Sequence, residues 1–165
     1  AGWGTPLPQG HARGIAIQEA FKTIVAEVAE VSVSASGELK VHRVVAVVDC
    51  GRMVNPNTVE QQVESGIIYG LTAALHGEIS IEKGAVAQSN FPDYEMVRMA
   101  DVPAIEVHVI ESGAALGGLG EPATPPIAAA VANAVFAATG KRIREMPLKN
   151  HDLTPLTAKF AQAAD

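Results

Sequence analysis

Residues 117–142 read GGLGEPATPPIAAAVANAVFAATGKR, and the rest of the chain is organised around this stretch. Gly118 and Gly120 lack a Cβ atom and accept positive φ angles, so the backbone there can come close to a bulky ligand. Pro122 presets a helical φ, and the alanine-rich residues that follow predict a buried helix. The pattern therefore places Glu121 at the N-terminus of a helix.

Two roles for Glu121 follow from this position. A carboxylate at a helix N-terminus is stabilised by the helix dipole, which makes Glu121 an ordinary capping residue in a Gly/Pro-rich turn. A carboxylate in an apolar pocket is instead suited to general-base chemistry. Composition alone favours the capping role, and both roles remain open at this point.

Length, charge and cysteine content limit what the chain can do. Its 165 residues are 48% hydrophobic, which is enough for one domain with a core of its own. The net charge of −6 disfavours a nucleic-acid or anionic-membrane surface. A single cysteine, Cys50, excludes an internal disulfide and any multi-cysteine iron–sulfur or zinc site within this sequence. Because Cys50 closes a valine-rich run, a small buried hydrophobe is favoured over a reactive thiol.

The first third of the chain predicts a sheet. Residues 1–13 are rich in Gly and Pro and predict an irregular connection. Residues 14–34 are rich in β-branched side chains and predict a strand with a bulge at 29–30, with a short helix as the competing interpretation. A turn at 34–38 leads into a strand over 39–48, so the two strands form a hairpin.

A sharp loop and a long helix follow this hairpin. Asp49 and Asn55 lie in the loop, where Asx side chains commonly close turns, so we expect bracing hydrogen bonds from them rather than ligand contacts. Asn57 or Thr58 is the predicted N-cap. Apolar residues then recur every four positions and predict one buried helical face, formed by Val59, Val63, Ile67, Leu71 and Leu75.

The two predicted helices differ in their surroundings. Gly66 and Gly70 of the first helix remove side-chain bulk and admit close backbone packing. The second helix contains Asn133 and stops at Gly140, so it falls short of the about 20 strongly apolar residues that a membrane span requires. We therefore expect no membrane span in this chain, and a buried helix with Gly140 as its C-cap.

The remainder of the chain adds smaller elements. Residues 77–88 predict a short hairpin, and residues 105–110 alternate as in a half-buried strand. His108 of that strand is predicted to be exposed, since no second His or Cys stands at ligand spacing. Residues 154–164 predict a short terminal helix. The order of elements favours the α+β class, with antiparallel or mixed sheet hairpins and two principal packed helices.

Two strings of this sequence resemble one family of enzymes. One string runs from Gly118 to Arg142, and the other from Asp49 to Gly66. Together they resemble the C-terminal portion of the molybdenum-binding large subunit of the xanthine dehydrogenase and aldehyde oxidase family, above all its isoquinoline 1-oxidoreductase beta-subunit branch. The resemblance covers about Gln9 to Leu148, whereas the family's subunit is several times longer.

The resemblance implies a site. In the family a Gly-x-Gly-Glu sequence supplies the glutamate beside the molybdenum, which assigns the catalytic base to Glu121 and cofactor contacts to Gly118 and Gly120. The glutamine that contacts the pterin corresponds to Gln62, whose alternative role is an ordinary helix-surface amide. The implied cofactor is molybdopterin, in a cytosine dinucleotide form, and this chain itself is expected to supply no metal ligand.

The resemblance also implies an activity and partners. The activity is oxidation of an aldehyde or N-heteroaromatic substrate with water as the oxygen donor. Residues 1–165 are then the C-terminal segment of a larger molybdopterin-binding catalytic domain and are inactive alone. The expected partners are the remainder of the molybdenum subunit and an iron–sulfur electron-transfer subunit that carries the clusters. A cytoplasmic location is expected, with the periplasm as the alternative.

A rival interpretation is a non-catalytic scaffold or interaction domain that retains only the fold, because the family's upstream cofactor loops lie outside this sequence. In either case we expect the two helices to leave apolar faces uncovered, and the chain therefore to require a packing partner.

Overall fold

The computed structural model describes residues 1–156 and has a mixed four-stranded sheet at its centre, in the order β1-β2-β3-β6. The strands are β1 (His11–Ala20), β2 (Thr23–Val33), β3 (Leu39–Asp49) and β6 (Ala104–Val109). β1, β2 and β3 are antiparallel neighbours, whereas β6 runs parallel to β3. The parallel pair needs a long crossover between its strands, and a helix supplies it.

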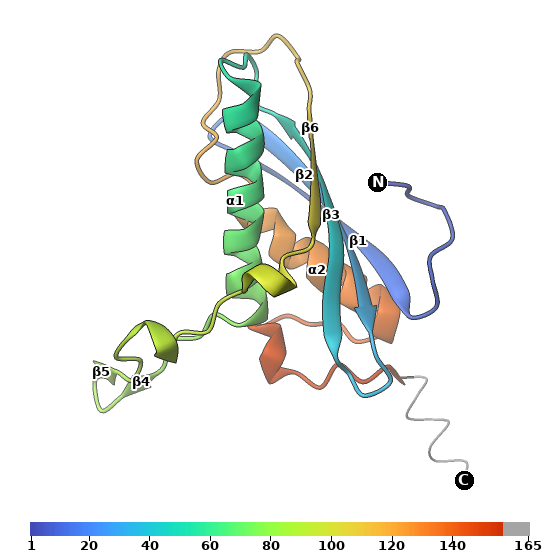
Figure 1. The fold of residues 1–165 in the computed structure, drawn as a ribbon, viewed down its shortest axis with the longest axis vertical. Helices are drawn as coiled ribbons and strands as arrows, with labels where there is room; N and C mark the ends of the chain where they lie inside the picture. Colours follow the sequence, from blue (N-terminus) through green and yellow to red (C-terminus); the bar gives the residue numbers. More distant parts are fainter. Residues whose placement is uncertain (157–165) are drawn as a thin grey trace.

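Two helices pack on one face of the sheet (Figure 1). α1 (Pro56–Leu75) forms the crossover from β3, and α2 (Thr124–Thr139) lies across β1 and β2. The smaller elements are β4 (Ile81–Glu82), β5 (Ala85–Val86), and the 3-10 turns η1 (Phe91–Asp93), η2 (Met99–Asp101) and η3 (Leu148–Asn150). Figure 1 shows the β4–β5 hairpin standing away from the sheet, beyond one end of α1. The predicted α+β class with hairpins and two packed helices is confirmed.

The core lies between the helices and the face of the sheet that they cover. Alternate residues of β2, from Thr23 to Val33, are buried on this face. The helices contribute side chains that are at most 1% exposed, namely Val63, Ile67 and Leu71 from α1 and Ile127, Val131 and Val135 from α2. The expectation of uncovered apolar faces was therefore wrong for α1, which buries its apolar face against the sheet and α2. The outer side of α2 still exposes Ala129, Phe136 and Ala137.

The single strand expected over residues 14–34 is two strands joined by a tight turn. The turn residues Phe21 and Lys22 have φ angles of 54° and 64°. Two successive positive φ angles are typical of two-residue hairpin loops, because such loops match the twist of the flanking strands. These loops usually carry Asn, Asp or Gly, and none of these residue types marks this turn, so it was missed.

The expected bulge is present, but its extra residue lies on the neighbouring strand. Glu30 pairs with Arg43 and Val31 pairs with Val41, so His42 of β3 is the extra residue. β2 itself keeps one phase throughout. Its apparent change of phase arose because Ile24 and Val28 are apolar residues of the opposite face.

The ends of the helices are set by their caps. Asn55, rather than Asn57 or Thr58, is the N-cap of α1, and its Oδ1 accepts a hydrogen bond from Thr58 N at 3.4 Å. Gly140 ends α2 with a φ of 77°, as predicted. Within residues 1–156 no helix has the length and apolar character to cross a membrane. The terminal helix predicted over 154–164 falls mostly outside the described residues.

Candidate functional site

The loop that carries Glu121 runs from the end of β6 past one end of α1 to the start of α2 (Figure 1). Hydrogen bonds tie it to the β1–β2 turn. Gly118 N donates to Phe21 O at 2.9 Å, and Thr23 Oγ1 donates to Gly118 O at 2.7 Å. The backbone next to Glu121 is thereby fixed to the sheet.

The glycines of this loop have different surroundings. A Cβ atom at Gly117 would lie 2.4 Å from Thr23 Oγ1, and one at Gly118 would lie 3.0 Å from Phe21 Cβ. These two glycines are therefore required for close packing against the turn. A Cβ atom at Gly120 would meet no atom within 4 Å. Gly120 thus borders open space, as a residue that a ligand approaches should.

Gln62 of α1 reaches the same loop. Its Nε2 donates to Gly120 O at 2.7 Å. The amide that was expected to contact the pterin therefore also holds the backbone carbonyl next to Glu121. Glu121 is exposed, and its backbone O accepts a hydrogen bond from Thr124 N at 2.9 Å in the turn that starts α2. Within residues 1–156 its carboxylate has no hydrogen-bond or ion-pair partner.

The start of α2 is pressed against two glycines of α1, as their expected role in close packing requires. A Cβ atom at Gly70 would lie 2.3 Å from Thr124 O and 2.4 Å from Ile127 Cγ2. A Cβ atom at Gly66 would lie 3.1 Å from Ala123 Cβ. These contacts set how deeply the helix that follows Glu121 sits on α1.

Asp49 braces the far end of the loop, as expected. Its Oδ1 accepts hydrogen bonds from Gly51 N at 3.0 Å and from Ser112 Oγ at 2.8 Å. Gly51 has a φ of 72°, and a Cβ atom there would lie 2.4 Å from Ala115 O. The end of β3 and the loop after β6 therefore pack as one unit.

The N-terminus of α2 offers few free backbone donors. Pro122, Pro125 and Pro126 have no N–H group, and Thr124 N already donates to Glu121 O. A helix N-terminus normally binds phosphate through such free N–H groups. The start of α2 therefore offers little for binding a phosphate group.

Two hollows in the described structure lie away from this loop. One, of about 490 Å³, is lined by residues of α1 and η3, including Leu75 and Leu148. The other, of about 370 Å³, lies beside α2 and includes Ala129 and Arg142. Neither is lined by Glu121, Gly120 or Gln62. The loop that carries Glu121 therefore lies outside both of these hollows.

Two other titratable side chains, those of Cys50 and His108, lie as the sequence predicts. The Cys50 thiol is buried, and burial raises its pKa, which confirms the expected buried hydrophobe. His108 is exposed, as expected. In the part of the chain that the structure describes, no group of three or more His, Cys, Asp or Glu side chains is placed to hold a metal ion.

Two polar residues were missed by sequence reasoning. Thr23 holds Gly118 O from a position 95 residues away, a distance that no local pattern spans. Glu27 is fully buried under α2, and neither of its carboxylate oxygens has a partner among the described residues. Burial raises the pKa of Glu27 to about 8. The alternation of β2 was the available signal, because it places Glu27 in phase with the buried Val25 and Ala29.

Comparison with known proteins identifies the family of this chain. Residues 9–103 match the molybdopterin cofactor-binding domain family, and the chain belongs to that family. It is 38% identical over 141 residues to the isoquinoline 1-oxidoreductase subunit beta of Brevundimonas diminuta, covering 85% of this chain and 18% of that protein. It is 37% identical over 123 residues to an aldehyde oxidoreductase molybdenum-binding subunit of Escherichia coli, covering 70% of this chain and 17% of that subunit.

The fold is also shared with a solved enzyme. The aldehyde oxidoreductase of Desulfovibrio desulfuricans superimposes with a TM-score of 0.69 at 25% identity, over 80% of this chain and 15% of that one. The expected resemblance to molybdenum-binding subunits is therefore confirmed. The chain spans less than a fifth of the length of each of these three proteins.

Proposed function

We propose that this chain is part of a molybdenum hydroxylase that oxidises an aldehyde or an N-heteroaromatic substrate, with water as the oxygen donor and Glu121 as the base. The observation that carries the proposal is the setting of Glu121. Its carboxylate is exposed and unpartnered within residues 1–156, while the backbone beside it is fixed by Thr23 and Gln62. A base must be held in place and still be open to its reactant, and this loop meets both conditions.

The described residues supply part of the protein's share of the chemistry. Molybdopterin, when bound, supplies the two-electron redox chemistry. Gly120 allows close approach, and Gln62 contacts the pterin while it holds Gly120 O. Gly118 contributes by fixing the loop to the β1–β2 turn. Glu121 takes the proton from the water-derived oxygen as that oxygen attacks the electrophilic carbon, and the proton ends on a carboxylate oxygen.

Other parts of the enzyme have to complete the site. The nucleotide of the cofactor, proposed to be cytosine, lies away from the proline-rich start of α2. The remainder of the molybdenum subunit supplies the other contacts to the cofactor, and electrons leave through an iron–sulfur subunit. We propose a cytoplasmic location for this assembly.

Replacing Glu121 by Gln in the assembled enzyme tests the assignment. The amide keeps the size of the side chain and leaves the backbone turn to Thr124 intact, but it cannot accept the proton. We expect turnover to fall at least about 100-fold while the molybdenum content is unchanged. Steady-state rates and metal analysis on the same preparations measure both.

Glu111→Gln is the matched control, since Glu111 is an exposed carboxylate of the same loop. Its turnover should stay near the wild-type rate. A Glu121→Gln enzyme that also turns over normally would show that Glu121 is not the base.

A scaffold role is the second candidate, and the absence of Glu121 from the lining of both hollows favours it. Metal analysis of the chain with the proteins that co-purify with it separates the two. Molybdenum in stoichiometric amount supports the enzyme. Its absence from every native complex supports the scaffold.

A further inference from the structure

The sheet has a second face that the helices do not cover, here called the open face. Strand residues point alternately to the two faces, so the open face carries the residues between the core positions. Its centre consists of aliphatic side chains from three neighbouring strands, namely Ile15, Ile17, Ile24, Ala26, Val28, Val45 and Val47.

The strand register makes these side chains one continuous patch. Ile15 lies opposite Val28, and Val28 lies opposite Val45 in the next strand. Exposure is highest on β1, where Ile15 is 47% exposed and Ile17 is 70% exposed, and it falls to 4% at Val45 of β3. An apolar patch that spans several strands marks an interaction surface.

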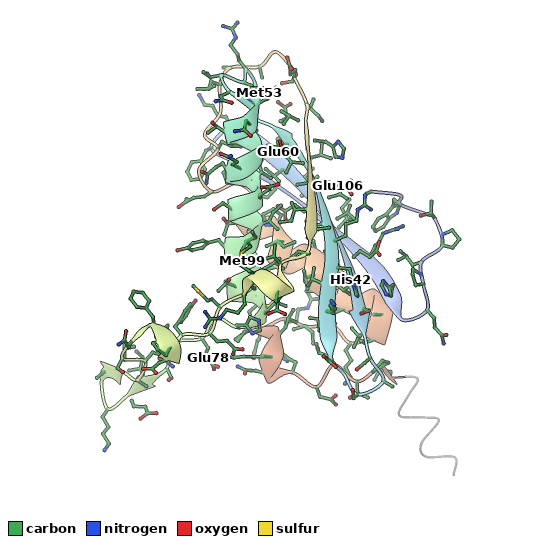
Figure 2. All side chains as sticks on the ribbon, in the orientation of Figure 1. His42, Met53, Glu60, Glu78, Met99 and Glu106 are labelled. Carbon is green, nitrogen blue, oxygen red and sulfur yellow. The ribbon has the colours of Figure 1, made fainter. Side chains whose placement is uncertain are left out.

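Polar side chains border one end of the patch, and they are already paired with one another. Arg43 donates to both carboxylate oxygens of Glu106, at 2.6 and 2.8 Å, and Arg13 donates to Glu30 at 3.2 Å. Figure 2 labels two polar residues of this region, His42 on β3 and Glu106 on β6. Because these charges are satisfied within the face, a charged ligand is not needed to neutralise them.

The patch resembles the interior of a domain rather than a transient contact surface. Its centre contains no Tyr, Trp or Arg, the residues that anchor most reversible interfaces, and only branched aliphatic residues and alanine. Permanent interfaces are the apolar ones and resemble a domain core cut in half. The occupant is therefore a permanently attached apolar surface.

The chain before β1 lies on the same side. Gly2 O and Thr5 Oγ1 accept hydrogen bonds from the Arg13 guanidinium, and Arg13 belongs to the open face. Figure 1 shows this N-terminal segment folding back beside β1. The relatives named above are more than five times as long as the segment they share with this chain, so a large surface of the same subunit is available.

We infer that the open face docks permanently against the remainder of the molybdenum subunit, with the exposed Ile15 and Ile17 of the edge strand β1 in the contact. The inference rests on the proposed function for the identity of the partner. The interface with the catalytic domain then lies on the side of the sheet opposite α2.

Thiol labelling of the assembled enzyme tests this inference. Ile17→Cys places a small apolar thiol at the most exposed position of the patch, where Ile17 is 70% exposed. Ile81→Cys places one on the β4–β5 hairpin, where Ile81 is 64% exposed. Both are exposed positions, so both variants should fold. If the open face is covered, maleimide should label position 17 at least about tenfold more slowly than position 81, because labelling then requires local opening. Mass spectrometry of the peptides identifies each site.

Equal labelling rates at the two positions would overturn the inference. Light scattering on the same samples identifies the occupant. The inference is supported if position 17 is labelled slowly in a complex whose molar mass corresponds to one molybdenum subunit with its partners. If slow labelling is found only in complexes of twice that molar mass, a second copy of the assembly covers the face. Labelling does not depend on turnover, so an inactive Glu121→Gln control enzyme should give the same protection.

Discussion

Glu27→Gln is expected to stabilise the protein, by an amount that grows as the pH rises from about 4.5 to about 8. Both carboxylate oxygens of Glu27 are buried and unpartnered within the described residues, and its cross-strand neighbours are Ala16 and Ala46. An uncompensated buried charge is strongly disfavoured, so the folded protein keeps the proton. The raised pKa of Glu27 has burial as its cause.

The direction of the pH dependence follows from proton binding. The pKa of Glu27 is about 8 in the folded protein and near the ordinary 4.5 in the unfolded chain. Between these values the unfolded chain binds fewer protons, so the stability of the folded state falls as the pH rises. Gln is buried at a cost similar to that of the protonated acid, and it never ionises. The expected gain is close to zero at pH 4 and about 3 kcal/mol at pH 7.

Urea unfolding of the purified protein at pH 5 and pH 8 measures this difference. Glu82→Gln is the control, because Glu82 lies exposed on the β4–β5 hairpin, and its effect should not depend on pH. An equal effect of Glu27→Gln at both pH values would mean that the carboxylate finds a partner in the assembled protein.

The helices and their contact could be predicted from the sequence, because both depend on local patterns. Apolar residues at intervals of four define the buried face of α1, and Gly66 and Gly70 indicate its close approach to another element. The β1–β2 turn could not be predicted, since Phe21 and Lys22 adopt positive φ angles that the surrounding strands impose. A tertiary constraint of this kind leaves no local sequence signal.

The candidate site shows the same division. Glu121 and Gln62 were identified by resemblance, and the structure joins Gln62 of α1 to the loop of Glu121 through a hydrogen bond to Gly120 O. The support from Thr23 depends on a contact between residues far apart in sequence. Gly118 was assigned to the cofactor by its motif, yet its nearest neighbour is Phe21. A motif shows that a glycine is required without showing which atoms require it.

Gly70→Ala is expected to lower both stability and turnover. Alanine favours a helix over glycine by about 1 kcal/mol, so helix propensity alone predicts a more stable protein. The added methyl group, however, would lie 2.3 Å from Thr124 O, and a backbone atom of another helix cannot move without moving that helix. Overpacking of this kind costs about 3 kcal/mol, so the net loss should be about 2 kcal/mol.

The effect on turnover follows from the same overlap. Relieving it shifts the start of α2 by about 1 Å, and a misplacement of this size at a reacting group lowers the rate by about 100-fold. Gly66→Ala is the graded control, because its methyl group would lie 3.1 Å from Ala123 Cβ and needs only a small adjustment. Helix propensity should nearly offset that adjustment. Denaturant unfolding measures the stability of both variants, and steady-state kinetics measures their kcat/KM. If Gly70→Ala and Gly66→Ala have the same stability and the same kcat/KM, α2 can move on α1 without displacing Glu121, and the prediction is wrong.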